Sequence, residues 1–377
     1  MTRLALVNAR VALPTGLRDG LCVIVEDGRI AGIGSDVPTS AEVVDLGGGT
    51  LVPGFIDTQV NGGGGRLFND DPSVETIRVI AETHRRFGTT GLLPTIISDD
   101  LSVVEAAIRA TDEAIEAGVP GVLGLHIEGP FLDPARRGIH DGAKLRRLED
   151  GFLELLASAR HGRTLVTLSP ESATPDQVAW LTRQGVIVAA GHSDAPYETV
   201  RAMIDAGITG FTHLFNAMSQ LANRAPGMVG AALEDDATYA GLIVDGHHLH
   251  PATVRVALRA KGPQRLMLVT DAMPSVGTDD PEFVLHGRRI RRVGDKLLGE
   301  DDVIAGSTLT MDAALRQVLA QTGIPLADAL TMASATPARF LGLQDQTGAI
   351  APGLRADLVL LDSDLAVRRS WIGGIAN

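Results

Sequence analysis

Residues 121–130 read GVLGLHIEGP, an apolar run that ends in a histidine, a glutamate and a Gly-Pro pair. Seven further apolar runs have a similar form, and helical stretches lie between most of them: GTLVPGFID, TTGLLPT, TLVTLSPE, GVIVAAGHSD, TGFTHLFNA, YAGLIVDGHH and RLMLVTDA. Strands that are apolar on both faces are typical of parallel sheets. Eight strand–helix units over roughly 250 residues predict an α/β fold, a TIM-like (β/α)8 barrel. An open doubly wound sheet is the alternative, but residues 62–65 form a plain glycine run without the spacing of a dinucleotide-binding turn.

The two ends of the chain have a different pattern. The first fifty residues contain short strand patterns, with Asp27-Gly28 as a hairpin signal between two of them. The last thirty contain a Gly/Pro turn followed by the apolar run Leu358–Leu361. Neither end is large enough to make a stable sheet by itself. We therefore expect residues 1–52 and 345–377 to form one discontinuous β-sandwich module, and residues 53–344 to form the barrel.

Composition and charge exclude several classes of partner. The chain has 377 residues and a formal net charge of −13, which argues against binding to nucleic acid or to an anionic membrane. Cys22 is the one cysteine, so an internal disulfide framework is excluded, as expected for a reducing compartment. The opening MTRLALVNARVALPTG is too short and interrupted for a signal peptide or a membrane span. These features predict a cytoplasmic protein without a nucleic-acid or membrane partner.

Ionisable residues gather where the apolar runs stop. Glu128 ends the third run, His192 the fifth and Asp271 the eighth, and His213 lies in the sixth. In a barrel these points lie on one rim, at the C-terminal ends of the strands, where active sites are built. One carboxylate and two histidines make a three-ligand metal site with an open fourth position for water. We assign this site to Glu128, His192 and His213.

Each of these residues also has a purely structural interpretation. A single histidine after a strand is more often hydrogen-bonded within the fold than bound to a metal, and Asp271 could cap a helix. We interpret four other histidines in this structural way: His84, His126, His161 and His286. For the residues at the strand ends the functional interpretation is favoured, because four separate strand ends finish in ligand or base chemistry.

Six motifs occur in order between residues 53 and 277: PGFIDTQVNGGGG, GLHIEGPFL, GHSDAPYE, THLFNAMS, GLIVDGHHLHP and LVTDAMPSVG. With the terminal β module they resemble the N-acetylglucosamine-6-phosphate deacetylases, a family within the amidohydrolase superfamily. HIEGPFL and THLFNAM are more specific than PGFID, which many amidohydrolases share. The resemblance implies metal-dependent deacetylation of N-acetyl-D-glucosamine 6-phosphate to D-glucosamine 6-phosphate and acetate, in amino-sugar catabolism or recycling.

The resemblance also implies roles for single residues. It places the metal on Glu128, His192 and His213, makes Asp271 the catalytic carboxylate and gives His140 the task of polarising the acetyl carbonyl. It implies substrate contacts by Ile139, His140, Asn216, Ala217, Arg224, His248, Ile304, Ala305 and Gly306. The loop RRGIHDGAK departs from the usual form after His140, so its contacts are left open. One divalent ion per chain is expected, Zn²⁺ first and Fe²⁺ or another divalent ion after it. A homodimer is also implied.

Gln59 and Asn61 lie in the stretch PGFIDTQVNG, two residues apart, where many barrel hydrolases carry a histidine pair that holds a second metal. Amide oxygens are weak ligands for zinc, so we expect the second-metal position to be empty. This argues against a two-metal amidohydrolase that acts on a cyclic amide. Three functions besides the expected one stay open: action on a different acetylamino sugar phosphate, action on a cyclic amide, and sugar-phosphate binding by a barrel without catalysis. A deacetylation assay separates the enzyme from the binding protein.

Overall fold

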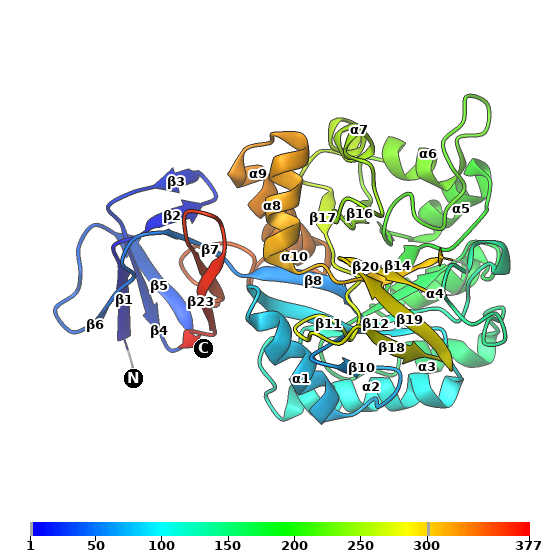
Figure 1. Ribbon diagram of the computed structural model, residues 1–377, viewed down its shortest axis with the longest axis horizontal. Helices are drawn as coiled ribbons and strands as arrows, with labels where there is room; N and C mark the ends of the chain where they lie inside the picture. The colour runs from blue at the N-terminus through cyan, green and yellow to red at the C-terminus, as the bar shows by residue number, and fades with distance from the viewer. Residues whose placement is uncertain (1–2, 300–301) are drawn as a thin grey trace.

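The centre of the molecule, seen in a computed structural model that describes residues 3–299 and 302–377, is an eight-stranded sheet. Its strands follow the order β17-β16-β15-β14-β13-β12-β11-β8, and every neighbouring pair is parallel. The strands are β8 (Phe55–Val60), β11 (Thr89–Ile97), β12 (Gly124–Glu128), β13 (Arg163–Leu168), β14 (Ile187–Ala190), β15 (Gly210–Phe211), β16 (Tyr239–Leu242) and β17 (Leu266–Leu268). They coincide with the eight apolar runs, so the predicted barrel is confirmed (Figure 1).

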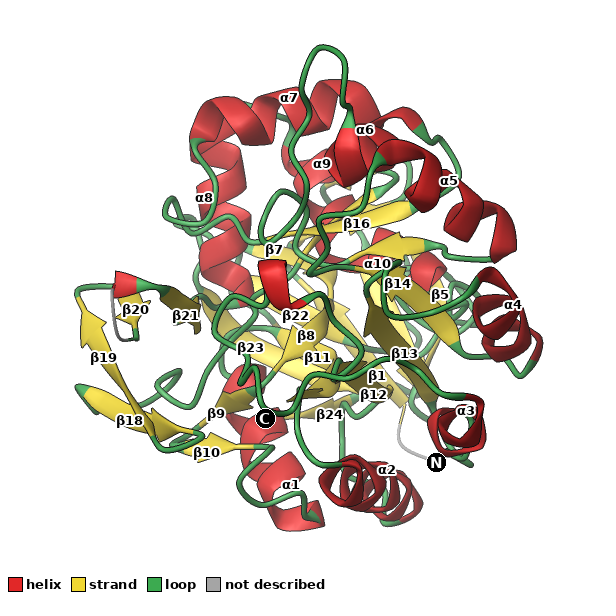
Figure 2. Ribbon diagram, turned by 90° about the vertical axis from the view of Figure 1, so that its right-hand side faces the viewer, coloured by secondary structure: helices red, strands yellow, loops and turns green. Residues whose placement is uncertain are grey.

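Helices surround the strands, as Figure 2 shows. They are α1 (Val74–Arg85), α2 (Leu101–Glu116), α3 (Leu153–Leu156), α4 (Pro175–Arg183), α5 (Tyr197–Ala206), α6 (Gly227–Glu234), α7 (Pro251–Lys261), α8 (Met311–Thr322), α9 (Leu326–Leu330) and α10 (Thr336–Phe340), with a π-helix at Thr331–Ala335 and 3₁₀ turns at Pro134–Arg136 and Asp150–Phe152. Helix α4 begins with a capping box between Thr174 and Gln177, which satisfies backbone donors that the first turn leaves free. Helix α2 buries Val104 and Ile108, which lie four residues apart and therefore on one face. Among the described residues, no helix is long and apolar enough to cross a membrane.

The barrel closes between its first and last strands with few backbone bonds. No ladder joins β8 to β17 in the described part of the sheet, and the contact there is an isolated bridge between Val60 and Ala272. Three backbone bonds join the two segments: the Asp271 N–H donates to the Gln59 carbonyl (3.0 Å), and the N–H groups of Asn61 and Gly62 both donate to the Ala272 carbonyl (2.9 Å each). The closing seam therefore lies directly beneath Asp271.

Both ends of the chain fold into separate sheets beside the barrel (Figure 1). One has the order β5-β4-β1-β6 and the other β24-β23-β22-β7-β2-β3, so the second sheet combines strands from both ends. The strands are β1 (Arg3–Val7), β2 (Arg10–Leu13), β3 (Gly16–Arg18), β4 (Cys22–Glu26), β5 (Arg29–Gly34), β6 (Glu42–Asp45), β7 (Thr50–Pro53), β22 (Leu358–Leu361), β23 (Val367–Ile372) and β24 (Ile375–Ala376). Leu6, Val23, Leu358 and Trp371 are buried in their common core. The terminal β module is thus confirmed.

A four-stranded antiparallel sheet was not anticipated from the sequence. It consists of β18 (Glu282–Leu285), β19 (Arg288–Val293), β20 (Lys296–Leu298) and β21 (Ile304–Ser307), inserted between β17 and α8. Its buried residues Leu285 and Ile290 belong to one hydrophobic cluster with Ile97 and Met273 from the barrel. A short hairpin of β9 (Gly62–Gly63) and β10 (Arg66–Leu67) also follows β8. We call strands β18, β19, β20 and β21 the flap sheet, because they pack on the rim that carries the polar residues.

Candidate active site

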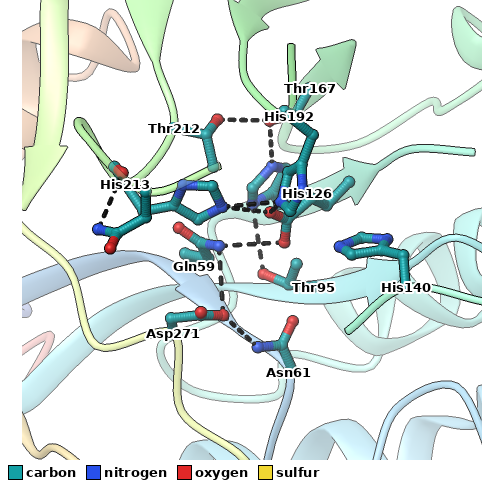
Figure 3. A network of polar contacts seen from close by, with 12 residues as sticks. Gln59, Asn61, Thr95, His126, His140, Thr167, His192, Thr212, His213 and Asp271 are labelled. Atoms are coloured by element: carbon teal, nitrogen blue, oxygen red, sulfur yellow. Dashed lines mark hydrogen bonds and ion pairs between the residues drawn. The ribbon is translucent and has the colours of Figure 1, made fainter. Parts of the chain in front are cut away.

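A carboxylate and two imidazoles converge at the ends of three strands of the barrel sheet, and Figure 3 shows the two histidines, His192 and His213. Glu128 ends β12, His192 follows β14 and His213 follows β15, and all three side chains are buried. Glu128 Oε1 lies 3.2 Å from His192 Nε2 and 3.0 Å from His213 Nε2, and the two Nε2 atoms are 3.0 Å apart. Separations of this size are those of ligand atoms around one small cation, since Zn–N and Zn–O bonds are about 2.0–2.2 Å long.

The hydrogen bond made by the second ring nitrogen of His192 defines its tautomer. Its Nδ1 lies 2.9 Å from the Arg136 carbonyl oxygen, which can only accept, so Nδ1 carries the proton. In the neutral ring Nε2 then presents a lone pair to Glu128 and His213. Such a bond from a ligand histidine to a backbone carbonyl is common around metal ions. The donor set therefore fits a divalent cation.

The electrostatics of the three residues are consistent with this. Burial alone would raise the pKa of Glu128, but its contacts with His192 and His213 outweigh burial and hold the pKa well below its usual range. Burial also opposes charge on His213, yet the neighbouring Glu128 raises the pKa of that imidazole. The site therefore keeps a buried negative charge next to groups that favour a positive one. A cation bound among them would compensate that charge.

The backbone is strained at the residues that face this point. His192 has a φ of +50°, His213 of +35° and Asp271 of +52°, and Ala217 has +52°. Residues other than glycine rarely adopt this left-handed region, and each case costs about 1–3 kcal/mol. Strain of this kind clusters at functional sites, where the surrounding structure holds it in place. Here it marks the ends of β14, β15 and β17.

His140 lies beside these ligands with a different proton arrangement. Its ring centroid is 4.5 Å from that of His192, and ligand atoms of Glu128, His140 and His192 all lie within 4.8 Å of one another. The His140 Nδ1 accepts from the Ser98 backbone N–H (3.3 Å) and contacts the Ser98 hydroxyl (2.8 Å). Burial, with the neighbouring His192, holds the pKa of His140 well below its usual range, so the ring is neutral. Its proton is then on Nε2, which acts as a donor.

Amide donors surround the carboxylate of Asp271. Asn61 Nδ2 donates to Asp271 Oδ1 (2.6 Å), and Gln59 Nε2 donates both to Asp271 Oδ1 (3.2 Å) and to Glu128 Oε2 (3.0 Å). Burial and then the charge of Glu128 raise the pKa of Asp271 to about 6, while the Asn61 amide opposes the shift. Gln59 therefore connects the proposed base to the ligand cluster, and both amides use their N–H groups on carboxylates.

These groups open into a cavity of about 210 Å³. Its lining comprises Asn61, Ile97, Glu128, Gly138, Ile139, His140, His192, His213, Asn216, Ala217, Ile243, His247, His248, Asp271, Met273, Ile304 and Gly306. Most of the predicted site residues are thus brought together. Ala305 is buried in the flap-sheet cluster instead of lining the cavity, and Arg224 is exposed and lies outside the lining. Arg224 is in the loop between His213 and α6, where the sequence indicates no position relative to the rim.

The sequence prediction missed five of these lining residues: Ile97, Gly138, Ile243, His247 and Met273. His247 is the ionisable one among them. His247 lines the cavity, and its Nε2 lies 2.7 Å from Asp295 Oδ1 at the turn between β19 and β20. The adjacent His248 contacts Asp245 through Nδ1 at 2.7 Å. The pair of histidines after β16 could have indicated this position in the sequence. The role of His247 follows only from its contact with the flap sheet. His247 holds the tip of this sheet against the site.

The four histidines interpreted as structural make hydrogen bonds within the fold. His84 contacts the Gly62 carbonyl, His161 contacts Glu116 and His286 contacts Asp99. His126 Nε2 lies 2.7 Å from Thr167 Oγ1, inside the barrel beneath the ligand cluster (Figure 3). Burial lowers the pKa of both His84 and His126 to about 4, so these two rings are neutral.

Known proteins resemble this chain over almost its whole length. The model of the amidohydrolase family matches residues 50–375. The N-acetylgalactosamine-6-phosphate deacetylase of Shewanella sp. is 46% identical over 373 residues, covering 97% of this chain and 94% of that protein. The N-acetylglucosamine-6-phosphate deacetylase of Haemophilus influenzae is 34% identical, covering 90% of each. The crystal structure of N-acetylglucosamine-6-phosphate deacetylase from Pasteurella multocida superposes with a TM-score of 0.96 at 33% identity, covering 100% of this chain and 99% of that one.

Proposed function

The chain belongs to the amidohydrolase family, and from this premise we propose that it hydrolyses the acetamide bond of N-acetyl-D-glucosamine 6-phosphate. The products are D-glucosamine 6-phosphate and acetate, as in amino-sugar catabolism. The observation that carries this proposal is the convergence of Glu128, His192 and His213 beside Asp271 in one cavity. Hydrolysis of an amide needs an electrophilic site for the carbonyl and a base for water, and this cavity supplies residues for both.

We assign the metal to Glu128, His192 and His213. Glu128, His140 and His192 form a competing cluster, but the acceptor role of His140 Nδ1 leaves Nε2 protonated and unable to bind a cation. The distances among the first three ligand atoms, 3.0–3.2 Å, also support them. Imidazole and carboxylate ligands suit Zn²⁺ and Fe²⁺ alike, and we propose Zn²⁺.

Two side chains handle the proton and the developing charge. A divalent ion at this site supplies Lewis-acid polarisation of the carbonyl and lowers the pKa of water. Asp271 accepts a proton from the attacking water at its carboxylate and then delivers it to the departing amine. The His140 Nε2–H donates to the carbonyl oxygen as negative charge develops there. Gln59 and Asn61 hold Asp271 in place, and the position of a second metal stays empty.

The remaining cavity residues receive the sugar phosphate. Asn216, Ala217 and His248 line one side, and the flap-sheet residues Ile304 and Gly306 line another. Arg224 supplies a guanidinium for the phosphate from outside the cavity lining, where a planar fork of donors suits an anion. A local cation matters here because the chain as a whole carries a net charge of −13 and does not attract anions.

A second substrate is favoured by one observation. The relative with 46% identity over 373 residues is an N-acetylgalactosamine-6-phosphate deacetylase, whereas the glucosamine relative from Haemophilus influenzae is 34% identical. The two substrates differ only in the configuration at C4, remote from the acetamide at C2. The same catalytic residues therefore serve either epimer, and N-acetyl-D-galactosamine 6-phosphate is the second candidate.

The test is a product assay on purified protein whose metal content has been measured. Acetate release from each 6-phosphate epimer, compared as kcat/KM, decides between the two candidates. No release from either epimer by metal-loaded protein would refute the deacetylase proposal and favour a sugar-phosphate-binding protein. We also propose a cytoplasmic homodimer, with the β module at residues 1–52 and 345–377 and the barrel at 53–344.

A further inference from the structure

Asp57 is a fully buried carboxylate at the closing seam of the barrel, two residues before Gln59. It accepts three hydrogen bonds there. Its Oδ2 accepts from the Thr270 hydroxyl (2.6 Å), and its Oδ1 accepts from the backbone N–H groups of Thr270 (3.3 Å) and Gln59 (3.2 Å). One side chain therefore joins β8 to the segment after β17 where backbone pairing is sparse.

The segment that Asp57 holds is Thr270-Asp271. Ser307 of the flap sheet binds the same segment from the opposite side: its hydroxyl donates to the Thr270 carbonyl (2.5 Å) and its N–H donates to the Asp271 carbonyl (2.9 Å). Asp271 has a left-handed backbone, so its side chain points into the cavity only while its neighbours maintain that conformation. Asp57 is the one of these neighbours that contacts both strands of the seam.

We propose that Asp57 is a positioning residue for the reaction. It holds the strained Thr270-Asp271 peptide so that the Asp271 carboxylate lies at the correct distance from the ligand cluster and the substrate carbonyl. This inference rests on the proposed function, because it takes Asp271 as the proton acceptor. Burial raises the pKa of Asp57 to about 7, which agrees with a residue kept for its geometry and not for its charge.

The test compares Asp57→Ala, Asp57→Asn and Thr270→Val with a matched control, Asp112→Ala. Asp112 is also a buried carboxylate that accepts backbone N–H groups, from Arg160 and His161, but it lies on α2 away from the cavity. We expect kcat of Asp57→Ala to fall about 100-fold, the size of effect that small misplacements of a catalytic group produce. KM and metal content should stay within about threefold of the wild type, since neither ligands nor substrate contacts change.

The remaining variants distinguish positioning from folding. Asp57→Asn keeps an acceptor for both N–H groups and should recover most of the lost kcat, whereas Asp112→Ala should lower the melting temperature without lowering kcat. Thr270→Val removes the hydroxyl donor with little change in volume. If Asp57→Ala does not fold, this variant tests the positioning role instead. Wild-type kcat in Asp57→Ala, or in Thr270→Val where that variant decides, overturns the proposal. So does an Asp57→Ala protein that loses metal or substrate affinity in parallel with kcat.

A crystal structure of Asp57→Ala or Thr270→Val gives a readout independent of turnover. The Asp271 carboxylate should move by more than about 0.5 Å relative to Glu128, which exceeds the tolerance of a catalytic constellation. An unmoved Asp271 overturns the positioning role. Absence of deacetylation by the wild type would instead refute the proposed function. The two failures are distinguishable, because the displacement of Asp271 is measured without turnover.

Discussion

The rim of the barrel has two halves with opposite hydrogen-bonding character. At the ends of β12, β14 and β15, Glu128 Oε1 and the Nε2 atoms of His192 and His213 face one another at 3.0–3.2 Å. At the ends of β8 and β17, the N–H groups of Gln59 and Asn61 face the Asp271 carboxylate at 3.2 and 2.6 Å. The first half directs a carboxylate and two imidazoles at one point, and the second half pairs its carboxylate with amide donors.

This difference explains the role of the amides at the end of the first strand. Lone pairs that face each other in a buried site require a cation, whereas a carboxylate that accepts amide N–H bonds is stabilised without one. A histidine pair in place of Gln59 and Asn61 would turn the second half into another ligand set. We therefore propose that the amides restrict the metal to one side of Asp271 and leave its carboxylate available to water.

Removal of the metal should have the largest effect. Dialysis against a chelator should abolish deacetylation, and added Zn²⁺ should restore it. Elemental analysis of the active enzyme should give about one divalent ion per chain, as expected for three ligands and an open position. Two tightly bound ions per chain, both needed for activity, would falsify the distinction between the halves.

Asp271→Asn tests the second half of the rim. It should lower kcat about 1,000-fold or more, because an amide cannot accept the proton of the attacking water. The metal content and the melting temperature should remain close to the wild type, since the ligands belong to the first half. Near-normal kcat in this variant would remove Asp271 from the role of base.

Much of the fold could be predicted because its signal is local. Runs such as GVLGLHIEGP indicate both that a strand is buried on two faces and where that strand ends. The flap sheet has no such apolar run: β18 and β19 lie in a charged segment, Glu282–Val293, in which Leu285 and Ile290 alone are buried within the strands, and they fold by pairing with each other. Its burial depends on contacts with Ile97 and Met273, which the sequence does not place.

The site residues likewise fall into those that a local pattern predicts and those that depend on distant contacts. Glu128, His192, His213 and Asp271 follow from strand ends, because a barrel brings all these ends to one rim. The tautomer of His140 depends on Ser98, forty-two residues away in sequence, and the interaction of Asp57 with Thr270 spans 213 residues. His247 was missed for the same reason, since its partner Asp295 lies on the flap sheet. Pairings at such distances are properties of the closed barrel and not of a local pattern.

Arg224→Ala asks whether the substrate also depends on a residue outside both halves. Loss of one charge-assisted contact costs roughly 1.5–3 kcal/mol, so KM for the 6-phosphate should rise about 10- to 150-fold with little change in kcat. Unphosphorylated N-acetylglucosamine, a poor substrate, serves as the control and should be unaffected. A similar change for both substrates would show that Arg224 does not bind the phosphate.

Asn61→Leu should have the smallest effect, and its size should depend on pH. Burial and the charge of Glu128 raise the pKa of Asp271 to about 6, and the Asn61 amide is among the groups that counteract this. A base works in its ionised form, so kcat/KM falls as the pH drops through the pKa of the free enzyme. Removal of the Asn61 donor withdraws stabilisation from the ionised carboxylate and raises its pKa. The acid limb of the plot of kcat/KM against pH should therefore move to higher pH by about one unit. A pKa shift of this size corresponds to a loss of about 1.4 kcal/mol of stabilisation of the ionised carboxylate.

The comparison between the wild type and Asn61→Leu isolates the hydrogen bond from Asn61 to Asp271, because a bound cation lowers the pKa of Asp271 in both proteins. Well above the limb the base is ionised in either protein, so the rates should converge as the pH rises. Metal content should not change, since Asn61 makes its bond to Asp271 in the second half of the rim and not to the ligand cluster. Superimposable profiles, or a limb that moves to lower pH, would show that the amide does not stabilise the base. The amides of the second half would then line the cavity without affecting the base, and only the metal ligands would distinguish the two halves of the rim.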